Sequence, residues 1–427
     1  MTENRNRRLT PLADRGPLRV MFLITSMPVG GAETLLVNLI RRLDPARFQA
    51  ELCCLKELGP LGEELAEEIP AHHGLLCCKY DLGVLRRLTR LMRSRQIDAV
   101  VTVGAGDKMF WGRLAAWRAR VPVVVSALHS TGWPDGVGRL NRLLTPLTDA
   151  FVGVAAEHGR YLVENERFPA EKVHVISNGV DVERFQFSAA ARRRVRQELG
   201  IDAATPVVGI VAALRHEKNH LLFLRAAALV HAELPEAKFL LVGDGPQRET
   251  LELTTRQLNL ESVVHFLGTR SDVPQLLSAI DVLALTSHIE ANPVSILEAM
   301  AVERPVVATR VGSVAESVDN GVTGYLAPSG DADSLALRWL ELLRDPDKAR
   351  EMGRAGREVV VRRWSLEKMV EGYTQLLTSI YESKSSLSNS SLSNSSLSTW
   401  RPPSESARPV ETAAEEKRAV GANSDGP

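Results

Sequence analysis

The sequence predicts an α/β protein with two domains, each built around a doubly wound parallel sheet. Short apolar runs alternate along the chain with segments of helical periodicity, and this alternation is typical of parallel strands joined by helices. The chain has 427 residues, enough for two domains of ordinary size, and 44% of them are hydrophobic, as in globular proteins. A polar segment, residues 186–205, separates the two alternating series, and we interpret it as an interdomain linker.

The charge balance, the apolar runs and the cysteines argue against several classes of protein. The 52 basic and 52 acidic residues give a formal net charge of zero, which argues against nucleic acid as a partner. No apolar run is long enough to span a membrane, and residues 1–17 form a basic, polar extension without the apolar core of a signal peptide. The pairs Cys53-Cys54 and Cys77-Cys78 lie in apolar runs and fit neither a zinc site nor a redox motif. We therefore expect buried, reduced thiols and a cytoplasmic location.

The first domain is expected over residues 18–185. Apolar runs bounded by turn residues predict its strands at residues 18–25, 50–55, 75–79, 99–103, 121–126, 150–154 and 173–176. In such a sheet the ligand binds outside the carboxyl ends of the strands. Gly30 and Gly31 follow the first strand and precede a helical pattern, where the backbone can approach a phosphate closely. His129 follows strand 121–126 at the same edge. A plain tight turn and a structural histidine are the respective alternatives.

The second domain is expected over residues 206–363. Its strands, some with their following turns, are predicted at residues 206–214, 238–246, 263–269, 281–287 and 305–309, and Gly243 and Gly245 are interpreted as turn glycines. Arg215 and Lys218 follow the first of these strands, where cations can neutralise a diphosphate leaving group as its charge grows. A solvated turn is the alternative, but positive charge at a helix start is unfavourable without an anion.

A helix is predicted over residues 294–302 from the spacing of its apolar positions. We expect Asn292 to be its N-cap and Pro293 its first residue, where the missing N–H of proline costs nothing. The free amides of Val294 and Ser295 would then point out of the helix start, a ready site for an anion such as a phosphate.

Two glutamates flank this helix start, Glu290 in the preceding loop and Glu298 more than one turn inside the helix. On their own, they are equally explained as surface charges of a soluble amphipathic helix. The string Glu290-Ala-Asn-Pro-Val-Ser-Ile-Leu-Glu298-Ala-Met-Ala301, however, resembles the signature of glycosyltransferase family 4, the retaining enzymes of GT-B fold. The resemblance implies that Glu290 lies by the transferred sugar and that Glu298 holds the ribose hydroxyls of a nucleotide-sugar.

Further strings extend the resemblance over residues 18–382. Pro28-Val-Gly-Gly-Ala-Glu-Thr34 is similar to the glycine loop of the family, and Ile176-Ser-Asn-Gly-Val-Asp-Val-Glu-Arg-Phe185 is similar to its interdomain string. The resemblance implies a GT-B fold, in which two Rossmann-like domains face each other across a cleft and a helix at residues 364–383 crosses back to the first domain.

The resemblance also assigns roles to single residues of the cleft. Members of the family place a histidine facing the donor after the strand that corresponds to 121–126, and here this residue is His129. The arginine that the family places five residues before its lysine falls at Ala213, so Arg215 is the candidate for that role and Lys218 is the lysine.

The function implied by the resemblance is that of a metal-independent, retaining hexosyltransferase. It would move a sugar from a UDP- or GDP-sugar to a glycan or lipid-linked acceptor in the synthesis of a cell-surface or extracellular polysaccharide, without a cofactor. Two alternatives stay open at this point, a nucleotide-sugar epimerase of the same fold and a catalytically silent scaffold that binds nucleotide-sugars.

Two acidic motifs, Asp331-Ala-Asp333 and Asp345-Pro-Asp347, match the pattern by which another class of glycosyltransferase binds a divalent metal. Each precedes a helical pattern, so capping and compensation of the helix dipole explain them better. We therefore predict no metal site.

Two segments outside the cleft suggest partners or disorder. Residues 84–96 and 109–121 combine many arginines with Trp111 and Trp117, which suits peripheral contact with an anionic membrane on its cytoplasmic face, although solvated helix faces are the commoner explanation. Residues 384–427 begin with a five-residue Ser-Leu-Ser-Asn-Ser repeat and contain few apolar residues, so we predict a disordered tail.

Overall fold

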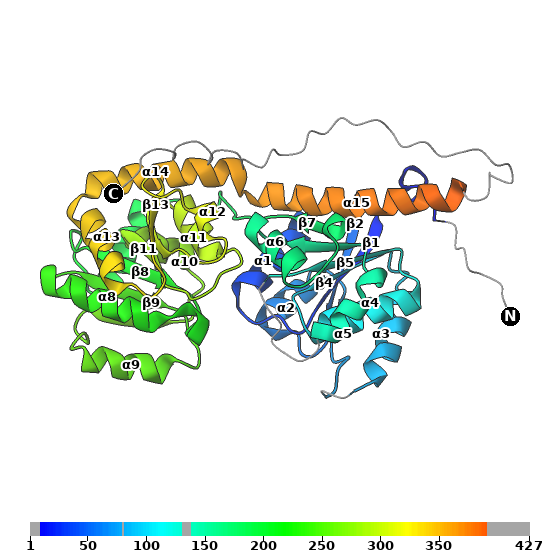
Figure 1. Ribbon diagram of the computed structural model, residues 1–427, viewed down its shortest axis with the longest axis horizontal. Helices are drawn as coiled ribbons and strands as arrows, with labels where there is room; N and C mark the ends of the chain where they lie inside the picture. Colours follow the sequence, from blue (N-terminus) through cyan, green and yellow to red (C-terminus); the bar gives the residue numbers. More distant parts are fainter. Residues whose placement is uncertain (1–8, 79–80, 130–137, 391–427) are drawn as a thin grey trace, which may run out of the picture.

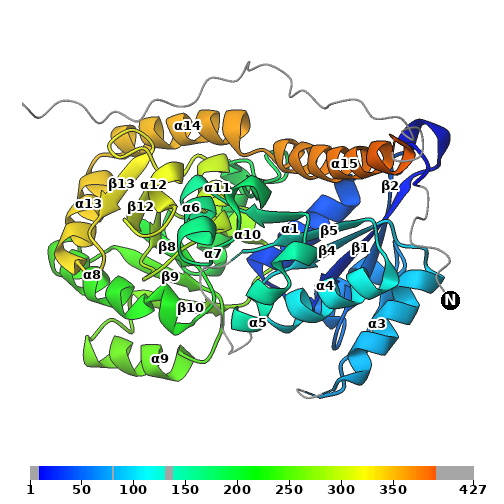
Figure 2. The same cartoon turned by 45° about the vertical axis from the view of Figure 1, so that its right-hand side comes forward.

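The computed structural model describes residues 9–78, 81–129 and 138–390. Two α/β domains lie beside one another, and a long helix near the end of the chain runs along one side of the molecule (Figure 1). Each domain has one parallel sheet between layers of helices, which Figure 2 shows from a second direction. The prediction of two doubly wound, Rossmann-like domains is confirmed.

The first sheet joins seven strands of the described residues in the order β3-β2-β1-β4-β5-β6-β7, and all pairs are parallel. The strands are β1 (Leu18–Ile24), β2 (Phe48–Cys54), β3 (Ala71–His72), β4 (Ala99–Val103), β5 (Val123–Ala127), β6 (Ala150–Gly153) and β7 (Val173–Val175). The helices are α1 (Gly31–Arg42), α2 (Gly59–Ala66), α3 (Gly83–Ser94), α4 (Asp107–Ala119), α5 (Gly138–Leu143) and α6 (Ala156–Glu164). Helix α1 covers one face of the sheet and α3 and α4 cover the other, so its central strands read as continuous apolar runs.

The second sheet joins six strands of the described residues in the order β10-β9-β8-β11-β12-β13, again all parallel. The strands are β8 (Val207–Val211), β9 (Lys238–Val242), β10 (Val264–Gly268), β11 (Val282–Leu285), β12 (Val306–Thr309) and β13 (Gly324–Ala327). The helices are α7 (Ala189–Glu198), α8 (His220–Glu233), α9 (Arg248–Gln257), α10 (Val273–Ala279), α11 (Val294–Ala301), α12 (Val314–Ser317), α13 (Ala332–Arg344) and α14 (Pro346–Arg363). Helices α8 and α13 cover one face, and α11 and α14 cover the other.

The strand predicted at residues 75–79 is wrong. The third strand is instead β3, which pairs with β2 through only two residues at the edge of the sheet. Leu76 is still buried, and its amide donates to the carbonyl of Leu55 at 2.7 Å. The expectation of buried thiols is wrong for Cys77 and Cys78, which are exposed, whereas Cys53 and Cys54 on β2 are buried as expected.

The polar segment 186–205 is not an open linker, because it contains α7, which packs against α10 of the second domain. Its arginines account for much of the polar composition, and two of them, Arg192 and Arg196, bond within the fold. Arg196 is buried and donates to the backbone carbonyls of Asp202, Ala203, Thr205 and Ala279. Strand β13 was not predicted, because it begins at Gly324 in a turn-rich segment and its apolar run covers only Tyr325 to Ala327.

The chain crosses between the domains in two segments that lie side by side. The amide of Val180 donates to the carbonyl of Trp364 at 2.9 Å, and the amide of Leu366 donates back to Val180 at 3.0 Å. Helix α14 lies on the second domain, and α15 (Leu366–Ser390) lies along the first, where Tyr373 and Leu377 enter the core (Figure 1). The predicted crossing helix at 364–383 is therefore present but longer.

The prediction of a disordered tail from residue 384 is wrong for residues 384–390, which continue α15. Lys384 anchors this end, because its Nζ donates to the carboxylate of Asp149 at 2.5 Å and to the carbonyl of Pro122 at 2.7 Å. The rest of the predicted tail, residues 391–427, lies outside the described residues. In the part of the chain that is described, no helix combines the length and apolarity needed to cross a membrane.

Candidate active site

The strand order places the candidate residues of both domains at two switch points. The order reverses between β1 and β4 in the first sheet and between β8 and β11 in the second. Ligands of such sheets bind where the order reverses, outside the carboxyl ends of the strands. The segments that follow these strands, loops or the first residues of the next helix, carry Gly30 and Gly31, Lys108, Lys218 and Glu290.

The two switch points face each other. A Cβ atom placed on Gly31 would lie 3.9 Å from Cγ2 of Val294, so the starts of α1 and α11 approach each other across the cleft. Asn292 was predicted as the N-cap of α11, which is wrong, because Pro293 occupies the cap and the helix begins at Val294. The Asn292 side chain instead donates to the carbonyl of Val154 in the first domain at 2.5 Å. The first-turn amides of Val294 and Ser295 have no partner inside the helix.

Glu290 is buried at the cleft and holds two hydrogen bonds on one carboxylate oxygen. Its Oε1 accepts from Nζ of Lys218 at 2.7 Å and from Oγ of Ser287 at 2.6 Å, and the residue is only 7% exposed. Its Oε2 has no hydrogen bond to the described residues. The ion pair thus fixes the side chain and leaves one oxygen for a ligand.

Gly312 and Ser313 fix the backbone of the loop that contains Glu290. Gly312 has a φ of +48°, and a Cβ atom there would lie 1.9 Å from the carbonyl oxygen of Glu290. The amide of Ser313 donates to that carbonyl at 3.3 Å, and its hydroxyl donates to the carbonyl of Ala291. Only glycine fits at position 312 with this backbone in place.

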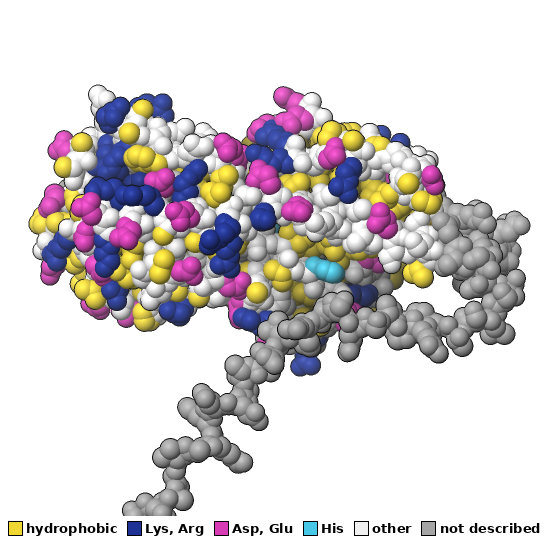
Figure 3. Space-filling view, turned by 90° about the horizontal axis from the view of Figure 1, so that it is seen from above, with side chains coloured by type: hydrophobic (Ala, Val, Ile, Leu, Met, Phe, Trp, Pro, Cys, Tyr) yellow, Lys and Arg dark blue, Asp and Glu magenta, His cyan; other side chains and the backbone are white. Residues whose placement is uncertain are grey.

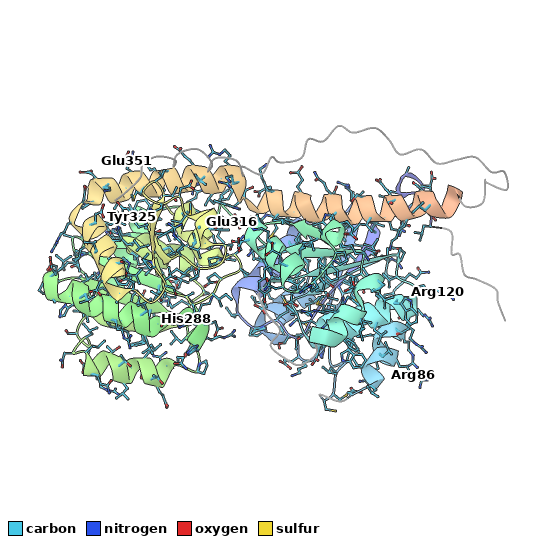
Figure 4. The ribbon with its side chains drawn as sticks, in the orientation of Figure 1. Arg86, Arg120, His288, Glu316, Tyr325 and Glu351 are labelled. Atoms are coloured by element: carbon cyan, nitrogen blue, oxygen red, sulfur yellow. The ribbon has the colours of Figure 1, made fainter. Side chains whose placement is uncertain are left out.

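The Lys218 loop is tied to the same region, whereas Arg215 is not. The carbonyl of Lys218 accepts from Oγ1 of Thr286 at 3.1 Å, and the amide of His288, labelled in Figure 4, donates to the carbonyl of Glu217 at 2.9 Å. Arg215 is 62% exposed, and its nearest carboxylate, on Glu217, lies 4.0 Å away. Of the two predicted cations, the structure joins only Lys218 to Glu290.

Glu298 lies away from the Lys218–Glu290 pair, further along α11. Burial raises the pKa of its carboxyl group to about 7, and the positive charge of Arg184 opposes this rise. Its carboxylate makes no hydrogen bond or ion pair with the described residues. Arg184 follows Val180 in the first of the two segments that cross between the domains, so Glu298 lies close to this crossing.

The first-domain side of the cleft centres on Gly30 and Glu33 of α1. Gly30 is the N-cap, and the carboxylate of Glu33 folds back over it, since a Cβ atom on Gly30 would meet Oε2 of Glu33. Burial raises the pKa of Glu33, while the charges of Lys108 and Arg215 lower it. The charge of Glu33 is therefore influenced by one cation from each domain, Lys108 at the start of α4 and Arg215 after β8.

His129 is half-buried at the end of β5 and lines a small cavity together with Phe22 and Tyr373. Burial, with smaller contributions from His158 and Lys108, lowers the pKa of its imidazole to about 4, so the ring is neutral at pH 7. Its Nδ1 has no hydrogen-bond partner among the described residues. No hydrogen bond joins His129 to Glu290.

Glu316 forms a contact between the domains that sequence reasoning did not assign. Its carboxylate accepts from the amides of Ala156 at 2.9 Å and Glu157 at 2.6 Å, at the start of α6 in the first domain. Figure 4 labels Glu316 at the border between the two domains. The cap residue of α6 is Ala155, whose side chain has no acceptor, so the other domain supplies the cap.

Gly243 and the two acidic motifs at Asp331 and Asp345 were interpreted as structural features. A Cβ atom on Gly243 would lie 2.1 Å from the carbonyl oxygen of Ala212, which agrees with its interpretation as a turn glycine. Asp331 caps α13 by accepting from the amide of Ser334, and Asp345 caps α14. Among the described residues, no group of three or more His, Cys, Asp or Glu side chains is arranged to hold a metal ion.

Sequence reasoning missed four residues that surround the candidate set: Lys108, Arg184, Ser287 and Glu316. Three of them had a local signal. Ser287 ends the strand before Glu290, Arg184 lies in the interdomain string, and Glu316 ends a glycine turn. Lys108 follows the Gly104-Ala-Gly106 turn after β4, but only the strand order shows that it lies near Glu33.

Comparisons with known proteins identify the family. Residues 29–184 match the model for Glycosyltransferase Family 4, and residues 191–359 match the model for glycosyl transferases group 1. The chain is 30% identical over 356 residues to the putative glycosyltransferase EpsF of Bacillus subtilis, which covers 80% of this chain and 90% of that protein.

A second relative is the UDP-Gal:alpha-D-GlcNAc-diphosphoundecaprenol alpha-1,3-galactosyltransferase of Escherichia coli. It is 26% identical over 375 residues, which cover 84% of this chain and 96% of that protein. The crystal structure of Anabaena Alr3699/HepE in complex with UDP-glucose matches with a TM-score of 0.75 and 25% identity, covering 85% of this chain and 100% of that one. With the two facing sheets described above, these matches show that the chain belongs to glycosyltransferase family 4 and has the GT-B fold.

Proposed function

We propose that the chain is a retaining hexosyltransferase that moves a sugar from a nucleotide-diphosphate sugar to a glycan or lipid-linked acceptor. The observation that carries this proposal is the ion pair of Lys218 and Glu290, whose atoms Nζ and Oε1 lie 2.7 Å apart. Glu290 stands four residues before Val294, the first residue of α11. This arrangement brings a cation, first-turn amides and a carboxylate to the carboxyl ends of two adjacent strands. This set suits a diphosphate that leaves a sugar.

The donor is proposed to lie mainly against the second domain. The charge that grows on the diphosphate would be stabilised by Lys218 and by the amides of Val294 and Ser295, so that no metal is needed. Arg215 would join them after the two domains close on the donor. Glu298 would accept hydrogen bonds from the ribose. The UDP-glucose complex of HepE supports a uridine diphosphate sugar as the first donor to test, with GDP-sugars as the alternative.

Retention is proposed to proceed without an enzyme nucleophile. A phosphate oxygen of the donor accepts the proton of the incoming hydroxyl as the sugar–phosphate bond breaks, and the new bond forms on the same face. Glu290 would orient the sugar through Oε2, and His129 would assist as a neutral imidazole that donates a hydrogen bond. NMR of the product should show the anomeric configuration of the donor, and an inverted product would overturn this mechanism.

The acceptor is proposed to be a sugar linked through diphosphate to a lipid, as in the name of the E. coli relative. The product would then serve as an intermediate of a cell-surface or extracellular polysaccharide. Assays with diphosphate-linked and free glycans as acceptors distinguish a lipid-linked substrate from a soluble one.

A lipid-linked acceptor also requires contact with a membrane, and helices α3 to α5 offer a face for it. Trp117 is 58% exposed, and Leu82 and Leu143 are exposed on the neighbouring helices. Figure 4 labels Arg86 on α3 and Arg120 at the end of α4, near the same end of the first domain. This combination suits an anionic lipid surface.

The structure corrects which arginines belong to this face. Arg113 is fully buried and donates to carbonyl and hydroxyl oxygens of Met109, Asn141 and Thr148, so it is a core residue. The side chain of Arg95 is 41% exposed, but its charge is already paired with that of the buried Glu51. We expect wild-type protein to sediment with anionic vesicles and Trp117→Ala to sediment less; equal recovery in the supernatant with and without vesicles would exclude membrane contact.

The donor site is tested by thermal shift with UDP-, GDP- and ADP-sugars in the absence of added metal. One donor class should raise the Tm of the wild type, and the shift should shrink in Lys218→Ala. Lys368→Ala, an exposed lysine on α15, is the matched control and should keep the full shift. No shift with any donor would contradict the donor site, a shift without transfer to any acceptor would favour the silent scaffold, and conversion of the donor without an acceptor would identify an epimerase.

A further inference from the structure

A second cavity, of about 460 Å³, opens at the edge of the second sheet opposite to the candidate active site. Pro206, Asp281 and Pro305 line it, and each stands immediately before a strand, β8, β11 or β12. Because these strands are parallel, the residues before them lie at the end away from Lys218 and Glu290. We call this cavity the amino-edge pocket, and the proposed function does not use it.

The amino-edge pocket has more positive than negative charge in its lining. Four arginines and two acids contribute to it: Arg192, Arg304, Arg350, Arg354, Asp281 and Glu303. Asp281 is already neutralised, because its two oxygens bind Arg192 at 2.6 Å and Arg196 at 2.9 Å. The remaining arginines therefore exceed the acids that could balance them.

Arg304 is the most confined of these arginines. Its guanidinium lies 4.7 Å from the centre of the Phe187 ring and donates to the carbonyls of Val302 at 3.1 Å and Ile280 at 3.2 Å. Among the described residues it forms no ion pair with a carboxylate, although the negative charges of Asp281 and Glu303 act on it. Burial, followed by repulsion from Arg192, lowers the pKa of Arg304 to about 10. The attraction of a bound anion would compensate for both effects.

The arginines on α14 complete the positive side of the pocket. Arg354 makes no hydrogen bond or ion pair with the described residues, and Arg350 pairs only with Asp347 in an exposed contact, which is weak. Figure 3 shows Lys and Arg side chains gathered over this domain on the side of α14. The helix is held close, since a Cβ atom on Gly353 would lie 2.1 Å from the carbonyl oxygen of Glu303.

The floor of the pocket is apolar. Leu342, Leu343 and Ala349 line it and are nearly or fully buried, and Pro346 stands beside them. A fully hydrated ion gains nothing from such a floor, whereas a ring or alkyl body attached to the anion does. The volume also suits a small organic ligand.

We propose that the amino-edge pocket is a second ligand site, which binds a phosphate monoester with an apolar or aromatic body. The phosphate would meet Arg304, Arg350 and Arg354, whose planar guanidinium groups bind phosphate oxygens in pairs. The body would lie on Leu342 and Leu343. The site is separate from the donor site and stands whether or not the proposed transferase activity is found.

Phenyl phosphate is the probe, titrated by calorimetry into protein that is held in excess UDP, which occupies the donor site. We expect saturable binding at one site, weakened at least about fivefold in Arg354→Gln and further in the double variant with Arg350→Gln. Arg362→Gln, an exposed arginine on the same helix outside the pocket, should bind as the wild type does. Inorganic phosphate and phenol should each bind more weakly than phenyl phosphate.

Three results would overturn the proposal. The first is that phenyl phosphate does not bind in the presence of UDP. The second is that it binds with equal affinity to Arg354→Gln and Arg362→Gln. The third is that UDP displaces phenyl phosphate that was bound in its absence. Repeating the titration with Lys218→Ala separates the two proposals, because that variant should lose the donor response and keep the affinity for phenyl phosphate.

Discussion

Lys218 and Glu290 are 72 positions apart in the chain, yet they share a hydrogen bond of 2.7 Å. Removing either partner leaves the other charge at a poorly hydrated site. The effect of Lys218→Ala will therefore include a displaced Glu290 as well as a lost diphosphate contact. Glu290→Gln keeps the shape and the bond from Ser287, so comparing the two variants separates charge from position.

The carboxyl group of Glu298 gives a pH dependence whose sign can be worked out. Its pKa rises from 4.5 to about 7 on folding, so the folded state keeps a proton that the unfolded chain releases. This contribution to stability is fully present below pH 4.5 and is lost as the pH rises through 7. Glu298→Gln should remove that loss and stabilise the ligand-free protein at pH 8 by about 1–3 kcal/mol.

Thermal unfolding at pH 5 and pH 8 checks this prediction, with the exposed Glu261→Gln as control. A stability difference between Glu298→Gln and the wild type that is the same at both pH values would contradict it. The same variant should respond less to UDP, because a neutral amide is a weaker acceptor for ribose hydroxyls than a carboxylate.

Gly312 is predicted to be essential for the position of Glu290. Alanine there meets two obstacles, a left-handed φ of +48° and a carbonyl oxygen 1.9 Å from its Cβ. Gly330→Ala is the control, since Gly330 also has a positive φ, +82°, but a Cβ atom there has no neighbour within 4 Å. Gly330→Ala should cost about 1 kcal/mol from strain alone.

Gly312→Ala should cost at least about 2 kcal/mol more than Gly330→Ala, because the Glu290 loop must move. It should also reduce the donor-induced thermal shift, which Gly330→Ala should leave intact. Chemical denaturation of both variants gives the comparison, and equal losses of stability would show that the contact at the Glu290 carbonyl does not matter.

Among the elements, α6 is unusual because a residue of the other domain caps it. The Glu316 carboxylate binds the amides of Ala156 and Glu157, where the helix dipole favours negative charge. Opening of the cleft would break these bonds. The contact therefore couples the start of one short helix to the relative position of the two domains.

Glu316→Ala should destabilise the closed arrangement by about 1 kcal/mol, the usual contribution of a helix cap. Small-angle scattering of the ligand-free variant should show a larger radius of gyration than the wild type. Glu351→Ala, which removes an exposed glutamate on α14 that Figure 4 labels, should not change the radius. An unchanged radius for Glu316→Ala would show that the contact does not hold the cleft.

At the scale of the whole molecule, α14 and α15 tie the two domains together. Helix α14 packs on α11, and α15 enters the first core through residues such as Leu377, which has no exposed surface. Helix α15 thus supplies part of the core of the first domain, so the first domain cannot be complete without it.

Leu377→Ala should destabilise the first domain by about 2–5 kcal/mol, through lost burial and a cavity in the core. Leu337→Ala, at a position 61% exposed on α13, is the control and should change stability by less than about 0.5 kcal/mol. Denaturant unfolding followed by the tryptophans gives the measurement. Equal stabilities would mean that α15 is not part of the first core.

The elements that could be predicted are those whose signal is local. A parallel strand that is covered on both faces appears as a continuous apolar run, so β4 was predicted to the residue and β1 to within one. The turns at Gly30 and Gly31 and at Arg215 to Lys218 follow such runs directly. Where the local signal was weak, prediction failed, as for the two-residue β3 and for β13, which begins at a glycine and ends just before Pro328.

Local patterns in the sequence were enough to predict the two-domain α/β class, the order of most strands and helices, the glycine turns and the candidate residues after the strands. These features follow from periodicity and turn chemistry within a few neighbouring residues. Three further features became visible only in the folded chain: Lys218 binds Glu290, Asn292 and Glu316 reach the other domain, and Arg113 is buried. Each of these depends on contacts between segments far apart in the chain, and no local pattern specifies which partners will meet.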